Sequence, residues 1–181
     1  MAIFPFVART PEAGETLVSS LRGDTFFKAG EVPSSALARL RAIFFNQLQA
    51  LHRCDLVPLG EADKLVKEGW EADPLGAALE AGKRAGVFGV IIGVVYRFEE
   101  RRGSAIGVQR PASVAFELLL LRVEDGEVLW HLQVDETQKS LSENLLKVGI
   151  FLKKGLRWVT AGELASEAME RGLRRFPPLK G

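Results

Sequence analysis

Two histidines and a single cysteine are the first residues of this chain to consider as a nucleophile or a general base. His52 and Cys54 lie two positions apart where a predicted helix runs into a predicted strand, and a thiolate beside an imidazole can form a nucleophile pair. A free cysteine is commonly a small buried apolar side chain, and no third residue is placed to orient the pair. The sequence therefore favours a packing role for Cys54, with catalysis as the alternative.

His131 and Asp135 lie on the polar face of another predicted strand, with Gln133 between them. Together these side chains could line a pocket or hold a metal ion. Residues four apart on a strand are separated by about 13 Å along its axis, which is too far to share one ion without other ligands. A solvated sheet face is the favoured interpretation.

Residues 99–111 are polar and basic and contain two glycines, features that invite comparison with phosphate-binding loops. The segment lacks the Gly-Lys-Ser/Thr ending of those loops and joins two predicted strands instead of opening a helix. We therefore predict a hairpin tip. Its arginines, Arg101, Arg102 and Arg110, are side chains that we expect to contact an acidic partner.

The elements that must position these residues follow from the spacing of apolar side chains. Helices are indicated by apolar stripes, by prolines at helix starts and by two capping boxes, and strands by alternation. In chain order we predict a strand at 2–7, a helix at 33–51, a strand at 54–58, helices at 61–68 and 74–85, strands at 87–98, 113–123 and 128–135, and helices starting at Ser140 and Thr160.

Two of these strands, 87–98 and 113–123, are apolar on both faces, which is typical of central strands. Because a polar tip separates them, we expect antiparallel neighbours. The strand 128–135 follows an Asp-Gly turn and has one polar face, which indicates an edge strand or a partly open surface. We predict one domain, 1–181, of the α/β class with α+β character. It consists of a single mixed sheet with helices packed on it, in the order strand-helix-strand-helices, then an antiparallel three-strand meander and C-terminal helices.

Residues 8–32 form a polar stretch that is too long for a plain connection within a compact domain. We expect a binding loop there, either irregular or with a short helix at about 15–21. Phe26 and Phe27 lie in this stretch and are candidate partner-binding residues.

The segment after Ser142 is apolar around most of its girth and is followed by basic residues. Such a helix is either buried in the core or docks on a partner or a membrane interface. Core packing is favoured. Phe151 and Trp158 are the side chains expected to bind a partner in the docking alternative.

Charge and composition narrow the function classes. The chain has 181 residues with 24 basic and 23 acidic side chains, a formal net charge of +1, so no global field draws it to nucleic acid. One cysteine excludes an internal disulfide. There is no signal peptide and no run of about 18 apolar residues that would span a membrane as a helix. The apolar segment 2–7 follows Met1 directly, as expected of a trimmed leader, which we favour, or of a natural short start.

Four stretches carry a resemblance that touches most of the chain: AIFPF, LRAIFFNQLQALHRCDLVP, GVIIGVVYRF and SVAFELLLLRVEDGEVLW. Together they resemble the envelope domain shared by the curli-export lipoprotein CsgG, the penicillin-binding-protein activator LpoB and the amino-terminal domain of TolB. The resemblance implies a periplasmic, outer-membrane-associated domain that acts by protein contacts, often with a lipid tether on an upstream cysteine. The long alternating hairpins of a pore-forming relative are missing, so no export channel is expected.

The residues and the resemblance predict a non-catalytic binding or scaffolding domain of the bacterial cell envelope, with a protein partner, no cofactor and no nucleic-acid ligand. The alternative is a small hydrolase or ligand-binding enzyme that uses His52, Cys54 or His131. A cytoplasmic location is the alternative to the periplasm. Hydrogen-bonding distance between any two of these side chains in a cleft would favour the enzyme.

Overall fold

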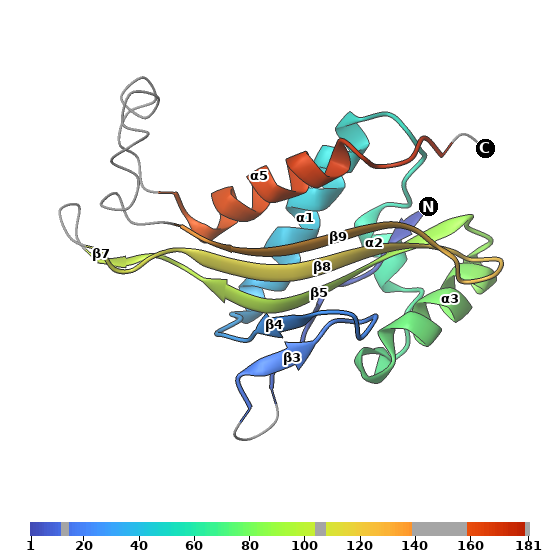
Figure 1. Cartoon of the computed structure of the whole chain (residues 1–181). Helices are drawn as coiled ribbons and strands as arrows, with labels where there is room; N and C mark the ends of the chain where they lie inside the picture. The colour runs from blue at the N-terminus through green and yellow to red at the C-terminus, as the bar shows by residue number, and fades with distance from the viewer. Residues whose placement is uncertain (12–14, 104–107, 139–158, 180–181) are drawn as a thin grey trace.

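The computed structural model describes residues 1–11, 15–103, 108–138 and 159–179. Within these residues a mixed sheet lies between helices on one face and a helix with a short hairpin on the other (Figure 1). This arrangement confirms the predicted fold class. None of the helices in this part of the chain is long and apolar enough to cross a membrane.

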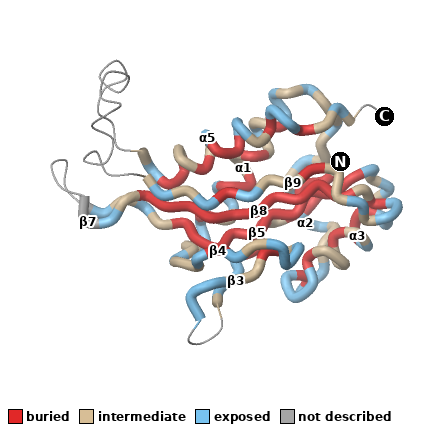
Figure 2. Tube along the Cα trace, viewed as in Figure 1, coloured by how far each residue is buried: buried red, intermediate tan, exposed pale blue. Residues whose placement is uncertain are grey.

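The sheet is built on three long antiparallel strands and is completed by two short parallel ones. In spatial order the long strands are β5 (Gly89–Glu99), β8 (Ser113–Arg122) and β9 (Val128–Thr137). The short strands β1 (Ala2–Ile3) and β2 (Val7–Ala8) both run parallel to the free side of β5. Nearly every residue of β5 and β8 is buried, so both are central strands and antiparallel neighbours, as predicted (Figure 2).

One face of the sheet is covered by α1 (Ser34–Ala50) and α5 (Ala161–Leu173). The stripe of α1 that contains Leu40, Phe44 and Leu48 is buried against the strands, because these residues recur at helical spacing. The predicted capping box is present at the start of α5. Both helices therefore follow the apolar pattern of the sequence.

The opposite face is covered by elements that come early in the chain. They are the hairpin of β3 (Leu17–Ser19) and β4 (Phe26–Lys28), the single turn η1 (Trp70–Ala72) and α3 (Pro74–Ala85). α3 begins at the proline, as predicted, and the Asp73 side chain caps it by accepting the Gly76 N–H at 3.1 Å. A short helix, α2 (Leu59–Asp63), contacts β1 beside the sheet.

A β-bulge in β5 changes which side chains reach the hairpin. The pairing of β5 with β8 shifts between Val95 and Arg97, so Tyr96 is an extra residue in β5. Val95 and Phe98 both face the core under α1 and α5. Tyr96 and Arg97 therefore both lie on the opposite face, where Tyr96 stacks on Phe27 and Arg97 reaches the backbone of Lys28.

The prediction of a short helix at about 15–21 is wrong, because the centre of this segment forms strand β3. Val18 packs toward the sheet while Leu17 is exposed, which is the alternation of a strand. The alternation extends over only three residues, so the sequence pattern is too short to reveal it.

The strand expected at 54–58 is also absent from this described part of the chain. The Val57 N–H donates to the Met1 carbonyl at 2.9 Å, but Pro58 follows directly and has no N–H with which to extend a ladder. The helix expected at 61–68 is shorter than predicted and ends at Asp63. The helix expected from Ser140, with Phe151 and Trp158, lies outside the described residues.

Replacing Gly93 by alanine should lower the free energy of unfolding by about 1–3 kcal/mol, because overpacking a dense interior strains it. A Cβ atom at Gly93 would lie 2.4 Å from Cδ1 of Phe6, whose ring rests on the glycine. Chemical denaturation measures the change. Gly60→Ala is the control, since a Cβ there meets nothing within 4 Å, and equal losses in both variants would contradict this packing.

Candidate functional site

The hairpin of β3 and β4 presents two different faces. Val18 pairs with Phe27, and both side chains face the sheet, where the Phe27 ring stacks on Tyr96 at a centroid distance of 4.3 Å. Leu17 and Phe26 are on the outer side and are 52% and 65% exposed. Of the two phenylalanines that we expected at a partner surface, Phe26 is therefore accessible, whereas Phe27 belongs to the core.

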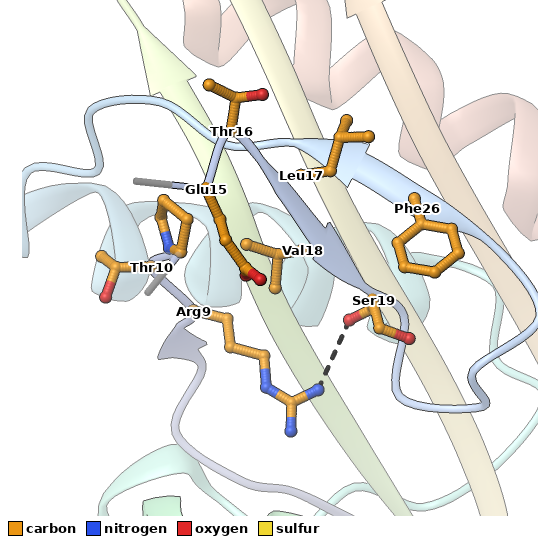
Figure 3. A pocket seen from close by; sticks show the side chains of 9 residues that line it. Arg9, Thr10, Glu15, Thr16, Leu17, Val18, Ser19 and Phe26 are labelled. Carbon is orange, nitrogen blue, oxygen red and sulfur yellow. Dashed lines mark hydrogen bonds between the residues drawn. The ribbon is translucent and has the colours of Figure 1, made fainter. Parts of the chain in front are cut away.

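An open hollow of about 670 Å³ lies between the hairpin and the segment that follows β2 (Figure 3). The Arg9 N–H donates to the Val95 carbonyl at 2.9 Å, which fixes this wall to the sheet. The Arg9 guanidinium donates to the Ser19 carbonyl at 3.5 Å, which links the two walls. The lining residues are Arg9, Thr10, Pro11, Glu15, Thr16, Leu17, Val18, Ser19 and Phe26.

Beneath the hairpin, the carboxylate of Glu117 is completely buried in the centre of the sheet. Its Oε2 accepts the Tyr96 hydroxyl at 2.9 Å and the Leu21 N–H at 2.8 Å. Its Oε1 lies 2.7 Å from Nε2 of His131. A buried carboxylate is strongly unfavourable unless donors surround it, so these contacts hold the chain after β3 against the sheet.

Tyr96 serves the carboxylate as a permanent donor. Burial raises the pKa of its phenol far above the usual value, and the negative charge of Glu117 raises the pKa further. The hydroxyl therefore keeps its proton throughout the physiological pH range. The Gly30 N–H donates to the Tyr96 carbonyl at 3.0 Å, so Tyr96 also holds the chain that follows β4.

Arg97, the residue after the bulge, holds the hairpin at a second point. Its buried guanidinium donates to the Ser113 hydroxyl at 2.8 Å, to the Lys28 carbonyl at 2.5 Å, and to the carboxylate of Asp135. These contacts join β4 to three strands of the sheet. Asp135, which we considered as part of a metal site with His131, instead neutralises this arginine.

The loop of the hairpin contacts β9 through Asp24. This carboxylate accepts the Ser20 hydroxyl at 2.9 Å and the Gln133 amide at 3.2 Å. The Ser20 hydrogen bond holds the pKa of Asp24 below its usual value. Gln133 and Asp135 are exposed, as predicted for a solvated sheet face, and the Gln133 side chain also contacts the hairpin through Asp24.

His52 and Cys54 do not have the properties of a nucleophile pair. Burial raises the pKa of the Cys54 thiol, which keeps it protonated, whereas a reactive cysteine needs a lowered pKa. The ring of His52 bonds to the backbone, with Nδ1 2.9 Å from the Ala50 carbonyl. Both residues line an open hollow of about 690 Å³ near α1. Among the described residues, no group of three His, Cys, Asp or Glu side chains could hold a metal ion.

The arginines predicted at the hairpin tip lie on or beside two short strands, β6 (Arg102–Gly103) and β7 (Val108–Arg110). Arg102 and Arg110 are paired across this ladder and are both exposed. Arg102 lies 3.5 Å from the carboxylate of Glu31, and Arg101 is half-buried. Their role in binding stays a prediction, as does that of Phe151 and Trp158.

The residues that fix the hairpin, Tyr96, Arg97 and Glu117, were not among the predicted site residues. The signal for Glu117 is a carboxylate inside a strand that is otherwise apolar on both faces. Such a residue requires buried donors, and the sequence does not say which ones. The bulge that turns Tyr96 and Arg97 to the same face leaves no mark in the apolar pattern.

No family model and no curated protein sequence matches this chain. Solved structures do match it. The PelC dodecamer from Paraburkholderia phytofirmans superposes with a TM-score of 0.52 and 15% identity, covering 99% of this chain and 87% of that one. Lipoprotein GNA1162 from Neisseria meningitidis superposes with a TM-score of 0.51 and 11% identity, covering 84% and 94%. At these identities the similarity shows a common fold.

One of the proteins named from the sequence resemblance is also among the matches. The LpoB C-terminal domain from Salmonella enterica superposes with a TM-score of 0.46 and 13% identity, covering 76% of this chain and 81% of that one. The superposition with GNA1162 confirms the resemblance at the level of a bacterial lipoprotein-like fold. The relation to CsgG and TolB stays a prediction.

Replacing Glu117 by alanine should lower the free energy of unfolding by about 2–4 kcal/mol, because buried donors lose their acceptor and a cavity forms. Urea denaturation measures this loss. Glu124→Ala is the control, since Glu124 is exposed in a turn and its replacement should change stability by less than about 0.5 kcal/mol. Similar stability of the two variants would contradict an anchoring role for the buried carboxylate.

The single tyrosine of the chain allows the burial of Tyr96 to be tested optically. The pKa of Tyr96 is raised in the folded state. Its contribution to the free energy of unfolding is therefore present below the unfolded pKa of about 10 and is lost as the pH rises above that value. In an ultraviolet titration, the native protein should form no tyrosinate at pH values where the urea-unfolded chain ionises. Ionisation at the same pH in both states, with circular dichroism still native, would contradict the described environment.

Proposed function

We propose that this chain is a non-catalytic protein-binding domain of the bacterial cell envelope, and that its partner docks on the outer face of the β3–β4 hairpin. The observation that carries the proposal is the contrast between the two sides of this hairpin. Its inner side is held by Phe27, Glu117 and Arg97, while Leu17 and Phe26 extend outward beside an open hollow.

Exposed large apolar side chains need a reason when they gather on a small element. Leu17, Phe26 and Phe88 are the large apolar side chains that are exposed in the described part of the chain, and two of them belong to this hairpin. Aromatic side chains that enter a partner's pocket contribute a large share of binding energy at interfaces. A hairpin whose backbone is already fixed loses little further conformational entropy on binding.

The chemistry of the hollow favours a partner that offers an apolar side chain with polar groups around it. Leu17, Val18 and Phe26 supply apolar contact, and Arg9, Glu15 and Ser19 supply charges and hydrogen-bonding groups at the rim. This combination is the usual anatomy of a protein interface, with an apolar centre and a polar edge. Exposed Arg102 and Arg110, on the separate two-strand ladder of β6 and β7, are proposed as further contacts for an acidic patch on the partner.

A role in the envelope is supported by the fold. The structures of lipoprotein GNA1162 and of the PelC dodecamer have the same architecture as this chain. We therefore propose a periplasmic location at the outer membrane. The enzyme alternative is not adopted, because the Cys54 thiol has a raised pKa and the His131 ring is engaged with Glu117.

Replacing Phe26 by serine should weaken binding of the native partner by about tenfold to a hundredfold, as expected for an interfacial aromatic residue. Site-specific photo-crosslinking in the native host identifies the partner, with the photoreactive side chain placed at position 26. Quantitative co-purification then measures the effect of Phe26→Ser. Stability should stay nearly unchanged, because Phe26 is 65% exposed.

Phe88 provides a matched control, since it is also a phenylalanine, is 55% exposed and lies directly before β5, outside the hairpin. Cross-linking from position 88 should not yield the same partner, and Phe88→Ser should retain binding. Equal losses for the two serine variants, or cross-links from position 88 alone, would move the interface away from the hairpin.

A further inference from the structure

A second surface that could bind a partner is the outer edge of β9, where backbone hydrogen-bonding groups have no neighbouring strand among the described residues. This strand pairs with β8 on one side and is the last strand in the order of the sheet (Figure 1). On its other side, no strand is present among the described residues. At the opposite limit of the sheet, by contrast, β1 and β2 cover the free side of β5.

The register shows which backbone groups of β9 face outward. The Gln138 N–H donates to the Ala112 carbonyl at 2.9 Å, in the same register as the β8–β9 ladder. Hydrogen-bonded pairs alternate along an antiparallel ladder, so every second residue counted back from Gln138 bonds to β8. The N–H and C=O groups of His131, Gln133 and Asp135 therefore point away from β8, toward the open edge.

This edge lacks the usual protection against strand pairing. Proteins commonly guard a free edge with proline or with charged side chains that repel a neighbour. Residues 130–136 contain no proline. Their two carboxylates are neutralised within the chain, because Asp135 pairs with Arg97 and Glu136 pairs with Arg171 of α5.

A groove of about 310 Å³ runs beside the edge, between β9 and α5. The helix approaches the strand closely at Gly172, where a Cβ atom would lie 2.6 Å from Leu132, and the Trp130 indole N–H donates to the Gly172 carbonyl at 3.4 Å. The groove is also lined by Arg171 and Arg175. Arg175 is exposed and forms no ion pair with any carboxylate of the described residues.

We propose that the edge of β9 binds an extended segment of a partner protein, which adds a strand to the sheet and places a carboxylate beside Arg175. Main-chain hydrogen bonds to His131, Gln133 and Asp135 supply affinity in this recognition mode, and side chains in the adjacent groove supply specificity. The surface is separate from the outer face of the hairpin, so this inference does not depend on the function proposed above.

Charge argues for a different protein in place of a second copy of this chain. Antiparallel pairing of two β9 edges about a twofold axis perpendicular to the sheet would place both α5 helices on the same face of the joined sheet. The two Arg175 side chains, which have no carboxylate partner among the described residues, would then lie on the same side of the joined sheet, and like charges at close range oppose association. An acidic extended segment meets the opposite charge instead.

Backbone amide exchange followed by NMR tests this inference with two short synthetic peptides. In both, threonine alternates with valine, and the central valine is replaced by glutamate in one peptide and by lysine in the other. The glutamate peptide should slow exchange at the amides of His131, Gln133 and Asp135 by about tenfold near saturation, whereas amides that already bond to β8 should not change. The lysine peptide should bind about threefold to tenfold more weakly.

Two variants make the test specific. Gln133→Pro removes one outward N–H without touching the β8 ladder, so it should abolish the slowing by the glutamate peptide. Arg175→Glu should reverse the preference between the peptides, and it keeps the test decisive if the proline variant fails to fold. Absence of slowing with both peptides, or equal slowing with both, would overturn the proposal. Slowing that grows with protein concentration without peptide would show that a second copy covers the edge, and would also overturn it.

Discussion

The buried carboxylate of Glu117 is the interaction on which the rest of this structure depends. A charge in the interior must be surrounded by donors, and here the donors come from β5, from β9 and from the backbone after β3. One side chain thereby joins the centre of the sheet, its edge and the hairpin. Replacement of the carboxylate by an apolar group would leave each of these donors without its acceptor, so the three contacts would be lost at once.

The bulge at Tyr96 makes this arrangement possible. In a regular strand, Tyr96 and Arg97 would face opposite sides of the sheet. The extra residue turns both toward the hairpin, where Tyr96 reaches Glu117 and Phe27, and Arg97 reaches the backbone of Lys28. The hairpin is held through its backbone and its inner side chains. Leu17 and Phe26 on the outer side are consequently free to contact a partner.

The two proposed surfaces are separate but are connected through two side chains of β9. The side chains of His131 and Gln133 contact Glu117 and Asp24, while their backbone groups face the open edge of β9. A strand that docks on this edge would therefore restrict the residues that hold the hairpin. We therefore expect binding at the β9 edge and binding at the hairpin to be coupled, because each binding event would order part of the same hydrogen-bond network.

The long strands and the main helices could be predicted from the sequence, because their apolar spacing extends over many residues. β5 and β8 are apolar on both faces, and the stripe of α1 repeats from Leu40 to Leu48. The hairpin could not be predicted, because β3 and β4 have three residues each. The sequence analysis predicted Phe26 and Phe27 as partner-binding residues, but the exposure of Phe26 and the burial of Phe27 depend on this hairpin. The anchors Tyr96, Arg97 and Glu117 depend on a bulge and on long-range hydrogen bonds that no local pattern encodes.

The exchange rate of the Leu21 amide tests most directly whether Glu117 holds the hairpin in place. Its N–H is donated to the buried carboxylate at 2.8 Å, so it should exchange only when the whole domain unfolds. The free energy of opening at Leu21 should then equal the global free energy of unfolding measured by denaturation. Rapid exchange at Leu21, with β5 and β8 amides still protected, would show that the hairpin detaches on its own and would contradict a preformed binding surface.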